Sequence, residues 1–377
     1  MSKKFLFTCG GTAGHINPAL GVAGRIKELL PDAEILFVGA EGKMETELVP
    51  REGYNIKTIT ITNIHRSMKP KEIVHNLNTL KNVAVSLGEA RKIIKEFRPD
   101  VAVGTGGYVC YPVLKAAHDM GIPTAVHESN AVPGLTTKML SGVVDKIMVG
   151  FEESRANYRN PDRVVVTGTP VRREFRNTDK NIAKAELGLP QDKPLVVSVW
   201  GSLGAAYMND IMAEFIERVC HKPTFTLIHS AGTRGYDAMM AKLKADGAAD
   251  CGDYGMDVRS YIYDMPKVMA AADLVLCRSG ASTLSELGVL GRPAILVPSP
   301  NVTNNHQEKN ARVLEAAGAA KVMLEGQFTA DGLVGMVSEL LRDKVELDKM
   351  AQSMKRLGTA DATEKITDIV IALADEK

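Results

Sequence analysis

Short apolar runs alternate with longer amphipathic segments along the whole chain. In the first half, the runs predict strands at residues 5–9, 34–39, 54–62, 99–103, 123–130, 146–149 and 164–166. In the second half, they predict strands at residues 195–200, 225–229, 258–263, 273–277, 292–298 and 320–323. Apolar runs bounded by glycine and polar residues are typical of strands buried in parallel sheets. We therefore predict an α/β fold with one doubly wound sheet in each half.

Helices are predicted between the strands, where apolar residues recur at helical spacing. In the first half they begin at about Pro18 and Tyr111. In the second half, Thr283 and Glu286 have the three-residue offset of a capping box at the start of a helix. We expect an N-terminal domain of residues 1–168 and a C-terminal domain of residues 169–356, with a last helix, about 357–377, packing back on the first. Other helices are expected from after Ala205 to about Cys220, at residues 281–290 and 311–317, and two or three from 331 onward, the last at about 362–374.

Glycine-rich turns follow two predicted strands of the first half. Residues 10–14 form the first turn and lead to His15, and residues 104–107 form the second and lead to Tyr108. Such turns can hold phosphate groups. A single glycine-rich turn is explained equally well as a tight turn that needs positive φ. A lone histidine at a strand–helix junction is more often structural. The glycines beside His15 and its place at the carboxyl edge of the sheet favour a functional role.

The stretch Cys277–Glu286 joins an apolar strand to a helix through Ser279 and Gly280. A helix that begins directly after a parallel strand directs its free N–H groups and the positive end of its dipole out of the sheet. The stretch therefore predicts a diphosphate site. Glu286, one turn into the helix, could reach a sugar hydroxyl beside that diphosphate. An ordinary strand–turn–helix junction explains the local sequence equally well.

Composition and charge exclude several classes of protein. The formal net charge of +1 does not indicate a nucleic-acid-binding protein. No apolar run approaches the ~20 residues that cross a bilayer, and the first residues lack the features of a signal peptide, so we expect any membrane contact to be peripheral. The five cysteines are scattered, which argues against structural zinc or disulfides and fits a reducing cytoplasm. Asp250 and Asp253 have the wrong spacing for a metal-binding Asp-x-Asp motif.

Residues 63–98 combine many cations with apolar residues at helical spacing. The periodicity of Ile73, Leu77 and Leu80 favours an amphipathic helix that faces the core. The alternative is a basic, partly apolar surface that lies on an anionic membrane. The cations in question are His65, Arg66, Lys69, Lys71, Lys81, Arg91, Lys92, Lys95 and Arg98.

Six motifs that occur in one order resemble the MurG family, namely Gly10–Leu20, Gly104–Tyr108, His127–Asn130, Thr169–Arg172, Cys277–Glu286 and Asn305–Gln307. The resemblance covers nearly the whole chain. It implies a GT-B fold, in which two Rossmann-like domains face a central cleft. It also implies an inverting transfer of N-acetylglucosamine from UDP-GlcNAc to the muramoyl-pentapeptide of lipid I, which gives lipid II and UDP in peptidoglycan synthesis. The implied location is the cytoplasmic face of the cell membrane, with proteins of cell-wall synthesis or division left open as partners.

The resemblance also assigns roles to individual positions. It places Asn130 and Gln307 at the donor sugar, the backbone of Ile262 at uracil, and Glu286 at the ribose hydroxyls. The full set implied for UDP-GlcNAc is Thr12, Ala13, Gly14, Asn130, Arg172, Ser202, Ile262, Ala281, Ser282, Thr283, Leu284, Ser285, Glu286 and Gln307. The set implied for the acceptor diphosphate is Gly104, Gly106, Gly107 and Tyr108.

An inverting transfer needs a base for the acceptor hydroxyl and positive potential on the departing diphosphate. Arg172 and a helix N-terminus could supply the potential, and this chemistry requires no metal or other cofactor. For the base we favour His15, because an imidazole titrates near working pH. His127 and Glu128 are second choices, and a role for His15 in binding the acceptor diphosphate alone stays open.

Two positions depart from the family pattern. Ala13 stands where the first turn usually has a glycine, which is tolerable only if φ stays negative. Trp200 replaces a glycine in the turn that carries Ser202, and it changes the wall behind that turn.

Two other functions remain open at this stage. A UDP-GlcNAc 2-epimerase would share the two Rossmann-like halves and the donor site, but it would not need the turn at residues 104–108. A non-catalytic nucleotide-sugar-binding subunit is the second, although one chain that carries both halves argues against it. The glycine spacing disfavours an NAD-dependent oxidoreductase.

Overall fold

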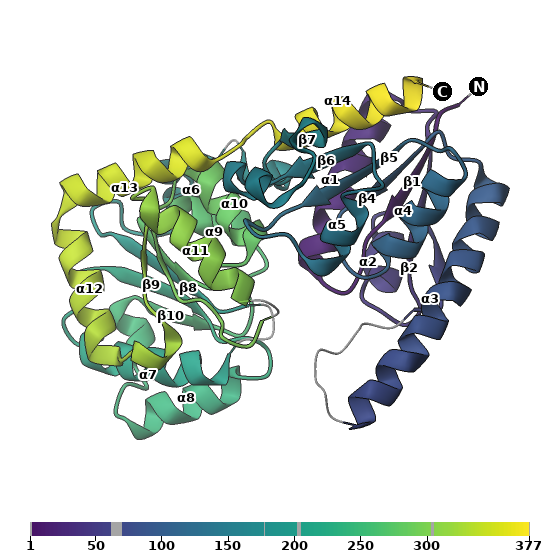
Figure 1. Ribbon diagram of the computed structural model, residues 1–377. Helices are drawn as coiled ribbons and strands as arrows, with labels where there is room; N and C mark the ends of the chain where they lie inside the picture. The colour runs from purple at the N-terminus through teal and green to yellow at the C-terminus, as the bar shows by residue number, and fades with distance from the viewer. Residues whose placement is uncertain (1, 62–69, 177, 202–204, 303–304, 377) are drawn as a thin grey trace. The chain divides into compact units, whose positions relative to one another are not determined.

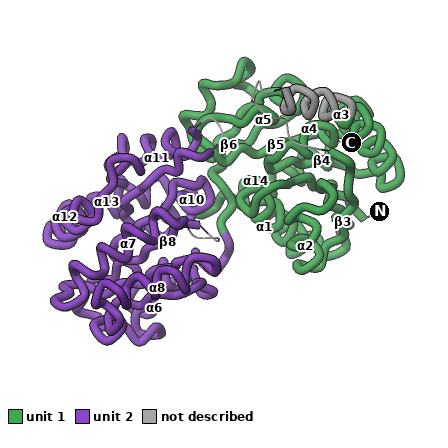
Figure 2. Tube along the Cα trace, turned by 90° about the horizontal axis from the view of Figure 1, so that it is seen from below, with its two compact units in different colours: residues 1–171, 360–377 green, residues 172–359 purple. Residues whose placement is uncertain are grey.

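The computed structural model describes residues 2–61, 70–176, 178–201, 205–302 and 305–376, with the backbone alone for residues 70–81 and 83. Its described part contains two parallel sheets, one of seven and one of six strands. The chain divides into two compact units (Figure 2): unit 1 is Met1–Val171 with Ala360–Lys377, and unit 2 is Arg172–Thr359. The predicted pair of Rossmann-like domains is confirmed.

The sheet of unit 1 has the strand order β3-β2-β1-β4-β5-β6-β7, and every pairing is parallel. Alternation along the first strand sorts its side chains between two helical layers. Phe5 and Phe7 pack on one face of the sheet, whereas Leu6 packs on the other. The strands are β1 Lys4–Thr8, β2 Glu34–Ala40, β3 Asn55–Ile59, β4 Val101–Gly104, β5 Thr124–Glu128, β6 Lys146–Val149 and β7 Val164–Val166.

Helices cover both faces of this sheet (Figure 1). The last helix, α14, packs against α1, and Val370 of α14 shares an apolar cluster with Val22 of α1 and with Phe5. The chain therefore ends in unit 1 after it has built unit 2. The helices of unit 1 are α1 Ala13–Leu29, α2 Glu45–Arg51, α3 Pro70–Phe97, α4 Cys110–Asp119, α5 Leu135–Leu140 and α14 Ala362–Asp375, with short 3-10 turns at Glu152–Asn157 and Pro161–Arg163.

The sheet of unit 2 repeats this topology in the order β10-β9-β8-β11-β12-β13, again entirely parallel. One face packs on α7, α12 and α13 through an apolar cluster that includes Phe215, Val337 and Met350. The strands are β8 Leu195–Val199, β9 Thr226–Ser230, β10 Met256–Arg259, β11 Leu274–Cys277, β12 Ala294–Leu296 and β13 Ala320–Val322. The helices are α6 Lys180–Glu186, α7 Ala206–Val219, α8 Tyr236–Ala245, α9 Met265–Ala271, α10 Ala281–Leu290, α11 His306–Ala316, α12 Ala330–Arg342 and α13 Lys344–Leu357, with short 3-10 turns at Arg173–Phe175, Cys251–Tyr254 and Glu325–Gln327.

Each sheet reverses its strand order at one point, between β1 and β4 in unit 1 and between β8 and β11 in unit 2. Ligands of open α/β sheets bind beside the carboxyl ends of the strands at such a point. The two glycine turns of the first half follow β1 and β4, and the stretch Cys277–Glu286 follows β11. The topology thus puts the candidate motifs where a ligand is expected.

Several predicted boundaries are wrong. Helix α1 begins at Ala13, not near Pro18, and Pro18 lies in its second turn, where it forgoes one hydrogen bond to the carbonyl of Gly14. Helix α11 begins at His306 rather than at Ala311, and β10 covers residues 256–259 rather than 258–263. The capping box is also wrong, because the N-cap of α10 is Gly280 and it makes no side-chain cap hydrogen bond.

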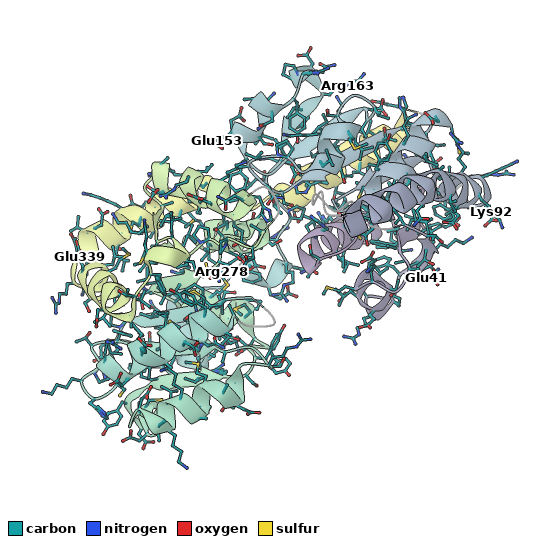
Figure 3. All side chains as sticks on the ribbon, turned by 60° about the horizontal axis from the view of Figure 1, so that its bottom comes forward. Glu41, Lys92, Glu153, Arg163, Arg278 and Glu339 are labelled. Carbon is teal, nitrogen blue, oxygen red and sulfur yellow. The ribbon has the colours of Figure 1, made fainter. Side chains whose placement is uncertain are left out.

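The basic segment forms α3 from Pro70 onward. In its described C-terminal part, Ala90, Ile93 and Ile94 are buried and face the core. The predicted apolar positions Ile73, Leu77 and Leu80 lie outside the described side chains. Lys92 points away from the protein (Figure 3), and Arg91 pairs with Asp119 at 3.3 Å. The cations His65, Arg66, Lys69, Lys71 and Lys81, for which a membrane-facing surface was the alternative prediction, lie outside the described side chains. Within the described residues, no helix is both long and apolar enough to cross a membrane.

Candidate functional site

The two glycine turns of unit 1 pack directly on each other. The N–H of Gly10 donates to the carbonyl of Gly106 at 3.2 Å. A side chain on Gly107 would place its Cβ 2.3 Å from the carbonyl oxygen of Gly10, and Gly107 has φ of +91°. Only glycine allows both this approach and this backbone conformation. The sequence therefore needs glycine here to bring the ends of β1 and β4 together.

His15 lies between the two turns, in the first turn of α1. Its Nδ1 is 2.9 Å from the carbonyl oxygen of Gly10. Because a carbonyl oxygen only accepts, Nδ1 carries the proton and donates it, which leaves Nε2 as the basic nitrogen of the neutral ring. The ring also packs on Gly106, where an added Cβ would come within 2.5 Å of its Cδ2. Thr105 fixes the backbone of His15 through a hydrogen bond of 2.6 Å from its hydroxyl to the His15 carbonyl.

A buried carboxylate that the sequence did not single out lies under the first turn. Glu45, at the start of α2, is fully buried. Its Oε2 accepts from the N–H of Gly11 at 3.1 Å, and its Oε1 accepts from the N–H of Ala40 at 3.0 Å. It fits only because Gly10 and Gly39 have no side chain, since an added Cβ at either would come within 2.5 Å of it. The only signal in the sequence was a glutamate soon after the turn that ends β2.

His127 is buried at the end of β5. Its Nε2 lies 2.9 Å from the carbonyl of Gly168, and its Nδ1 lies 3.4 Å from the hydroxyl of Ser129. Burial lowers the pKa of His127, although the bond to Gly168 and the charge of Glu128 oppose the shift. The ring is therefore neutral near pH 7, and both of its nitrogens have partners in the protein.

Glu128 holds the backbone that follows β5. Its Oε1 accepts from both the backbone and the side-chain nitrogen of Asn130, at 3.0 and 2.9 Å. Its Oε2 accepts from the N–H of Gly134 at 2.9 Å and from the hydroxyl of Thr137 at 2.8 Å. These four bonds occupy the carboxylate. They orient the side chain of Asn130 and the start of α5.

In unit 2, helix α10 begins at the carboxyl end of β11 with an open first turn. Its N-cap Gly280 offers no side-chain acceptor, and an added Cβ there would meet nothing within 4 Å. The N–H groups of Ala281, Ser282 and Thr283 precede the first intrahelical bond, which Leu284 donates to Gly280. Among the described residues no acceptor pairs with these three N–H groups, and with the positive end of the helix dipole they suit a diphosphate.

Glu286 lies one turn further along the same helix. Burial raises the pKa of its carboxyl to about 7, and the nearby charge of Arg172 opposes this shift. Arg172 itself is exposed, and its guanidinium lies 5.1 Å from the centre of the Phe175 ring. The structure thus brings a titrating carboxyl and a cation to the side of α10.

A set of hydrogen bonds joins the starts of α10 and α11. The hydroxyl of Ser279 donates to the backbone carbonyl of Gln307 at 2.8 Å, and the amide of Asn310 donates to the carbonyl of Ser279 at 3.3 Å. The side-chain oxygen of Gln307 accepts from the N–H of Ser299 at 2.9 Å. Because this bond uses the oxygen, the amide NH2 of Gln307 is the end that remains to donate.

Trp200 forms a wall at the carboxyl end of β8. Its ring is buried, packs edge-on against Phe328 with centroids 6.3 Å apart, and lies 6.0 Å from the guanidinium of Arg278. Arg278, at the end of β11 (Figure 3), also pairs with Glu325 at 2.6 Å and donates to the carbonyl of Val297 at 3.0 Å. The tryptophan and the ion pair together fix Arg278.

The remaining predicted residues are placed as follows. Ile262 is buried in the segment between β10 and α9, and Ser285 donates from its hydroxyl to the carbonyl of Ala281 at 3.0 Å. Tyr108 is half-buried, and burial raises the pKa of its hydroxyl. Ser202 lies outside the described residues. Among the described residues, no three His, Cys, Asp or Glu side chains form a cluster that could hold a metal ion.

Comparison with known proteins decides the family. Residues 5–149 match the glycosyltransferase family 28 N-terminal domain, and residues 195–366 match the family 28 C-terminal domain. The chain is 46% identical to a protein of Acetivibrio thermocellus, over 97% of each chain, that is named UDP-N-acetylglucosamine–N-acetylmuramyl-(pentapeptide) pyrophosphoryl-undecaprenol N-acetylglucosamine transferase. A Thermoanaerobacter protein of the same name is 44% identical over 97% of this chain and 99% of its own.

The chain belongs to the MurG family.

Solved structures agree with this assignment. The crystal structure of MurG from Acinetobacter baumannii superposes with a TM-score of 0.78 at 25% identity, over 98% of this chain and 99% of that one. A UDP-GlcNAc 2-epimerase from Neisseria meningitidis superposes with a TM-score of 0.62 at 15% identity, over 99% and 100% of the two chains. At that identity the epimerase shares the fold alone.

One departure from the MurG family pattern has a simple structural explanation. Ala13 is the first residue of α1, and it is not among the residues with positive φ. A methyl group is therefore accommodated without backbone strain.

Proposed function

We propose that this member of the MurG family transfers N-acetylglucosamine from UDP-GlcNAc to the muramoyl-pentapeptide of lipid I, with inversion, and releases lipid II and UDP. The observation that carries the proposal is the 46% identity, over 97% of both chains, to a transferase named for this reaction. It makes the chain a glycosyltransferase of peptidoglycan synthesis. The donor groups of unit 2 and the turns of unit 1 supply chemistry that suits it.

The donor diphosphate binds at the start of α10. The free N–H groups of Ala281, Ser282 and Thr283 and the helix dipole stabilise the charge that develops on the departing UDP. Arg172 adds a positive charge near Glu286. Glu286 accepts hydrogen bonds from the ribose hydroxyls when it is ionised. The backbone of Ile262 binds uracil, and the remaining donor residues act as the resemblance assigns them.

The sugar is held by amide groups. The NH2 of Gln307 faces away from its bond to Ser299 and donates to the sugar. Asn130, whose side chain is oriented by Glu128, is the second amide. Oriented amides favour a sugar whose hydroxyl and acetamido groups match their hydrogen-bonding directions.

His15 is the base, and the tautomer explains why. The bond from Nδ1–H to Gly10 leaves the Nε2 lone pair to accept the proton of the acceptor hydroxyl. As the proton leaves, the hydroxyl oxygen attacks the anomeric carbon, the bond to the UDP oxygen breaks, and UDP departs as the anion. His127 and Glu128 are not the base in this proposal, because their polar atoms already have protein partners. They support the structure of the site instead. The turn of residues 104–108 binds the acceptor diphosphate.

Lipid I is anchored in a membrane by its polyprenyl chain, so the acceptor reaches the enzyme at the cytoplasmic face of the cell membrane. We propose peripheral attachment there. The cations of residues 65–98 are the candidates for contact with anionic lipids. Sedimentation with vesicles that contain anionic lipid, compared with neutral vesicles, tests the attachment. Equal recovery of the protein with both kinds of vesicle would contradict an electrostatic contact.

The activity is tested by UDP release from UDP-GlcNAc with and without a soluble lipid I analogue. Release that depends on the acceptor supports the transferase. Release without acceptor, together with free N-acetylmannosamine, would identify an epimerase instead. Donor binding without release under either condition would identify a non-catalytic nucleotide-sugar-binding protein.

A further inference from the structure

Two side chains of unit 1 bind opposite ends of one peptide group. The peptide that joins Gly10 to Gly11 accepts at its carbonyl oxygen from Nδ1 of His15, at 2.9 Å. The same peptide donates its N–H to Oε2 of Glu45, at 3.1 Å. A continuous row therefore runs from the Glu45 carboxylate, through the peptide, to the imidazole. Neither partner is close to the other in the sequence.

We propose that Glu45 is a positioning residue that orients His15 and strengthens it as a base, acting through the Gly10–Gly11 peptide. This inference rests on the proposed function of His15 as the base. A carboxylate that accepts from a peptide N–H increases the negative charge on the carbonyl oxygen of that peptide. The oxygen then stabilises the positive ring that forms when Nε2 takes a proton. A buried carboxylate has the same effect on a histidine when the two bond directly.

The local packing fixes this row in one geometry. Oε1 of Glu45 also accepts from the N–H of Ala40, so both carboxylate oxygens are tied to backbone. The carboxylate lies where a Cβ on Gly10 would come within 2.5 Å of Oε1, and a Cβ on Gly39 within 2.5 Å of Cγ. On the other side, the N–H of Gly10 is held by the carbonyl of Gly106. The peptide therefore has little freedom to rotate away from either partner.

Among the described residues, four titratable groups around this peptide are neutral near pH 7, namely those of Cys9, Cys110, Tyr108 and His127. Burial raises the pKa of Cys9 on β1 well above its usual range and that of Cys110, after β4, to about 12. Burial also raises the pKa of Tyr108, which flanks Gly11, and lowers that of His127 on β5. Both oxygens of Glu128 are bonded to Asn130, Gly134 and Thr137 rather than to this peptide. Glu45 is thus the acidic group that is linked to His15 by hydrogen bonds, through the Gly10–Gly11 peptide.

The first test measures the titration of His15 itself and needs no turnover. The pH dependence of the His15 ring nitrogens is followed by nitrogen-15 NMR in the wild-type chain and in Glu45→Gln. We expect the variant to titrate about one pH unit lower, which corresponds to about a tenfold loss of basicity. Glu47→Gln is the matched control, because Glu47 lies on the same helix but is exposed. An unshifted titration in Glu45→Gln, with the ring signals of a folded protein, would overturn the inference.

The second test separates this role from a purely structural one. Glu45→Gln and His15→Ala are combined in a double-mutant cycle, and kcat is measured with the soluble lipid I analogue. We expect Glu45→Gln to lower kcat about tenfold when His15 is present and less than about twofold when it is absent. We also expect the acidic limb of the wild-type pH profile to move to lower pH in Glu45→Gln. Equal losses in both backgrounds would contradict a role through His15, whereas a wild-type chain without transfer activity would contradict the proposed function instead.

Discussion

The hydroxyl of Ser279 donates a hydrogen bond of 2.8 Å to the backbone carbonyl of Gln307. Ser279 is fully buried in the turn before α10, and Gln307 lies in the first turn of α11. The bond therefore sets the distance between a helix start that suits the donor diphosphate and an amide that suits the donor sugar. If the two helices bind the diphosphate and the sugar as proposed, this one hydroxyl aligns them.

Removal of this hydroxyl should weaken donor binding more than it slows the chemistry. A buried neutral hydrogen bond contributes about 1 kcal/mol, so we expect Ser279→Ala to raise KM for UDP-GlcNAc about fivefold. Steady-state kinetics at saturating acceptor provides the measurement. Ser141→Ala, which removes a local hydroxyl–carbonyl bond at the end of α5, serves as the control and should leave KM unchanged. A loss confined to kcat would speak against the alignment role.

The affinity for the donor should depend on pH through Glu286. Burial raises the pKa of this carboxyl to about 7, so it is protonated below pH 7 and ionised above it. In the proposed role only the ionised form accepts from the ribose hydroxyls, so donor affinity should rise with pH by about tenfold between pH 6 and pH 8. Isothermal titration calorimetry with UDP-GlcNAc measures this directly. In Glu286→Gln the affinity should be lower and the dependence flat, and a wild-type profile equally flat would exclude Glu286 as the titrating group.

His15 should dominate the chemical step. We expect His15→Ala to lower kcat by about 10²–10⁴-fold, the usual contribution of a general base, with little change in the dissociation constant of UDP-GlcNAc. His127→Gln is the informative comparison, since the glutamine amide can still donate to the carbonyl of Gly168. That variant should keep most of its activity. If it lost as much as His15→Ala, the assignment of the base would have to be reversed.

Glu128 should contribute to stability as well as to the site. In Glu128→Gln one carboxylate oxygen becomes an NH2 group that faces donors from Asn130 or from Gly134 and Thr137. We expect the free energy of unfolding of unit 1 to fall by about 2 kcal/mol. Thermal unfolding, with Glu153→Gln as an exposed control in the same unit (Figure 3), gives the comparison. Identical unfolding midpoints for the two variants would show that the four bonds are dispensable.

Trp200 should be a structural residue of unit 2. Trp200→Gly restores the usual family residue but removes the contacts with Phe328 and Arg278, which should cost about 3–5 kcal/mol of unfolding free energy. Trp200→Phe should cost far less, because the indole N–H has no hydrogen-bond partner among the described residues. Chemical denaturation of both variants tests this. A glycine variant as stable as the wild type would mean that the neighbouring residues repack around the gap.

The sequence allowed the two Rossmann-like halves to be predicted, because buried parallel strands are continuous apolar runs. Boundaries at glycine turns were less predictable. Pro18 suggested a helix start, yet α1 begins at Ala13, since the turn places the chain in helical geometry before the proline. Helix α11 likewise begins at His306 within a polar stretch, because its N-cap Asn305 adopts left-handed geometry that composition does not reveal.

The candidate site was predictable wherever chemistry and spacing coincide in one stretch. His15 stands beside its own glycine turn, and Glu286 lies on α10, the helix proposed to bind the diphosphate. Glu45 could not be found in this way. Its importance depends on burial beneath Gly10 and Gly39 and on two bonds to backbone, and no local pattern encodes them. The hydrogen bond between His127 and the carbonyl of Gly168 could not be predicted either, because it joins residues that are far apart in the sequence.

The most direct test of this account is the structure of the product formed from UDP-GlcNAc and a soluble lipid I analogue. Mass spectrometry should show that the acceptor gains one N-acetylhexosamine, and proton NMR should show a β-linked anomeric centre, inverted from the α-linked donor. An acceptor of unchanged mass would contradict the proposed transfer. A product with a retained α linkage would contradict the single displacement in which His15 acts as the base.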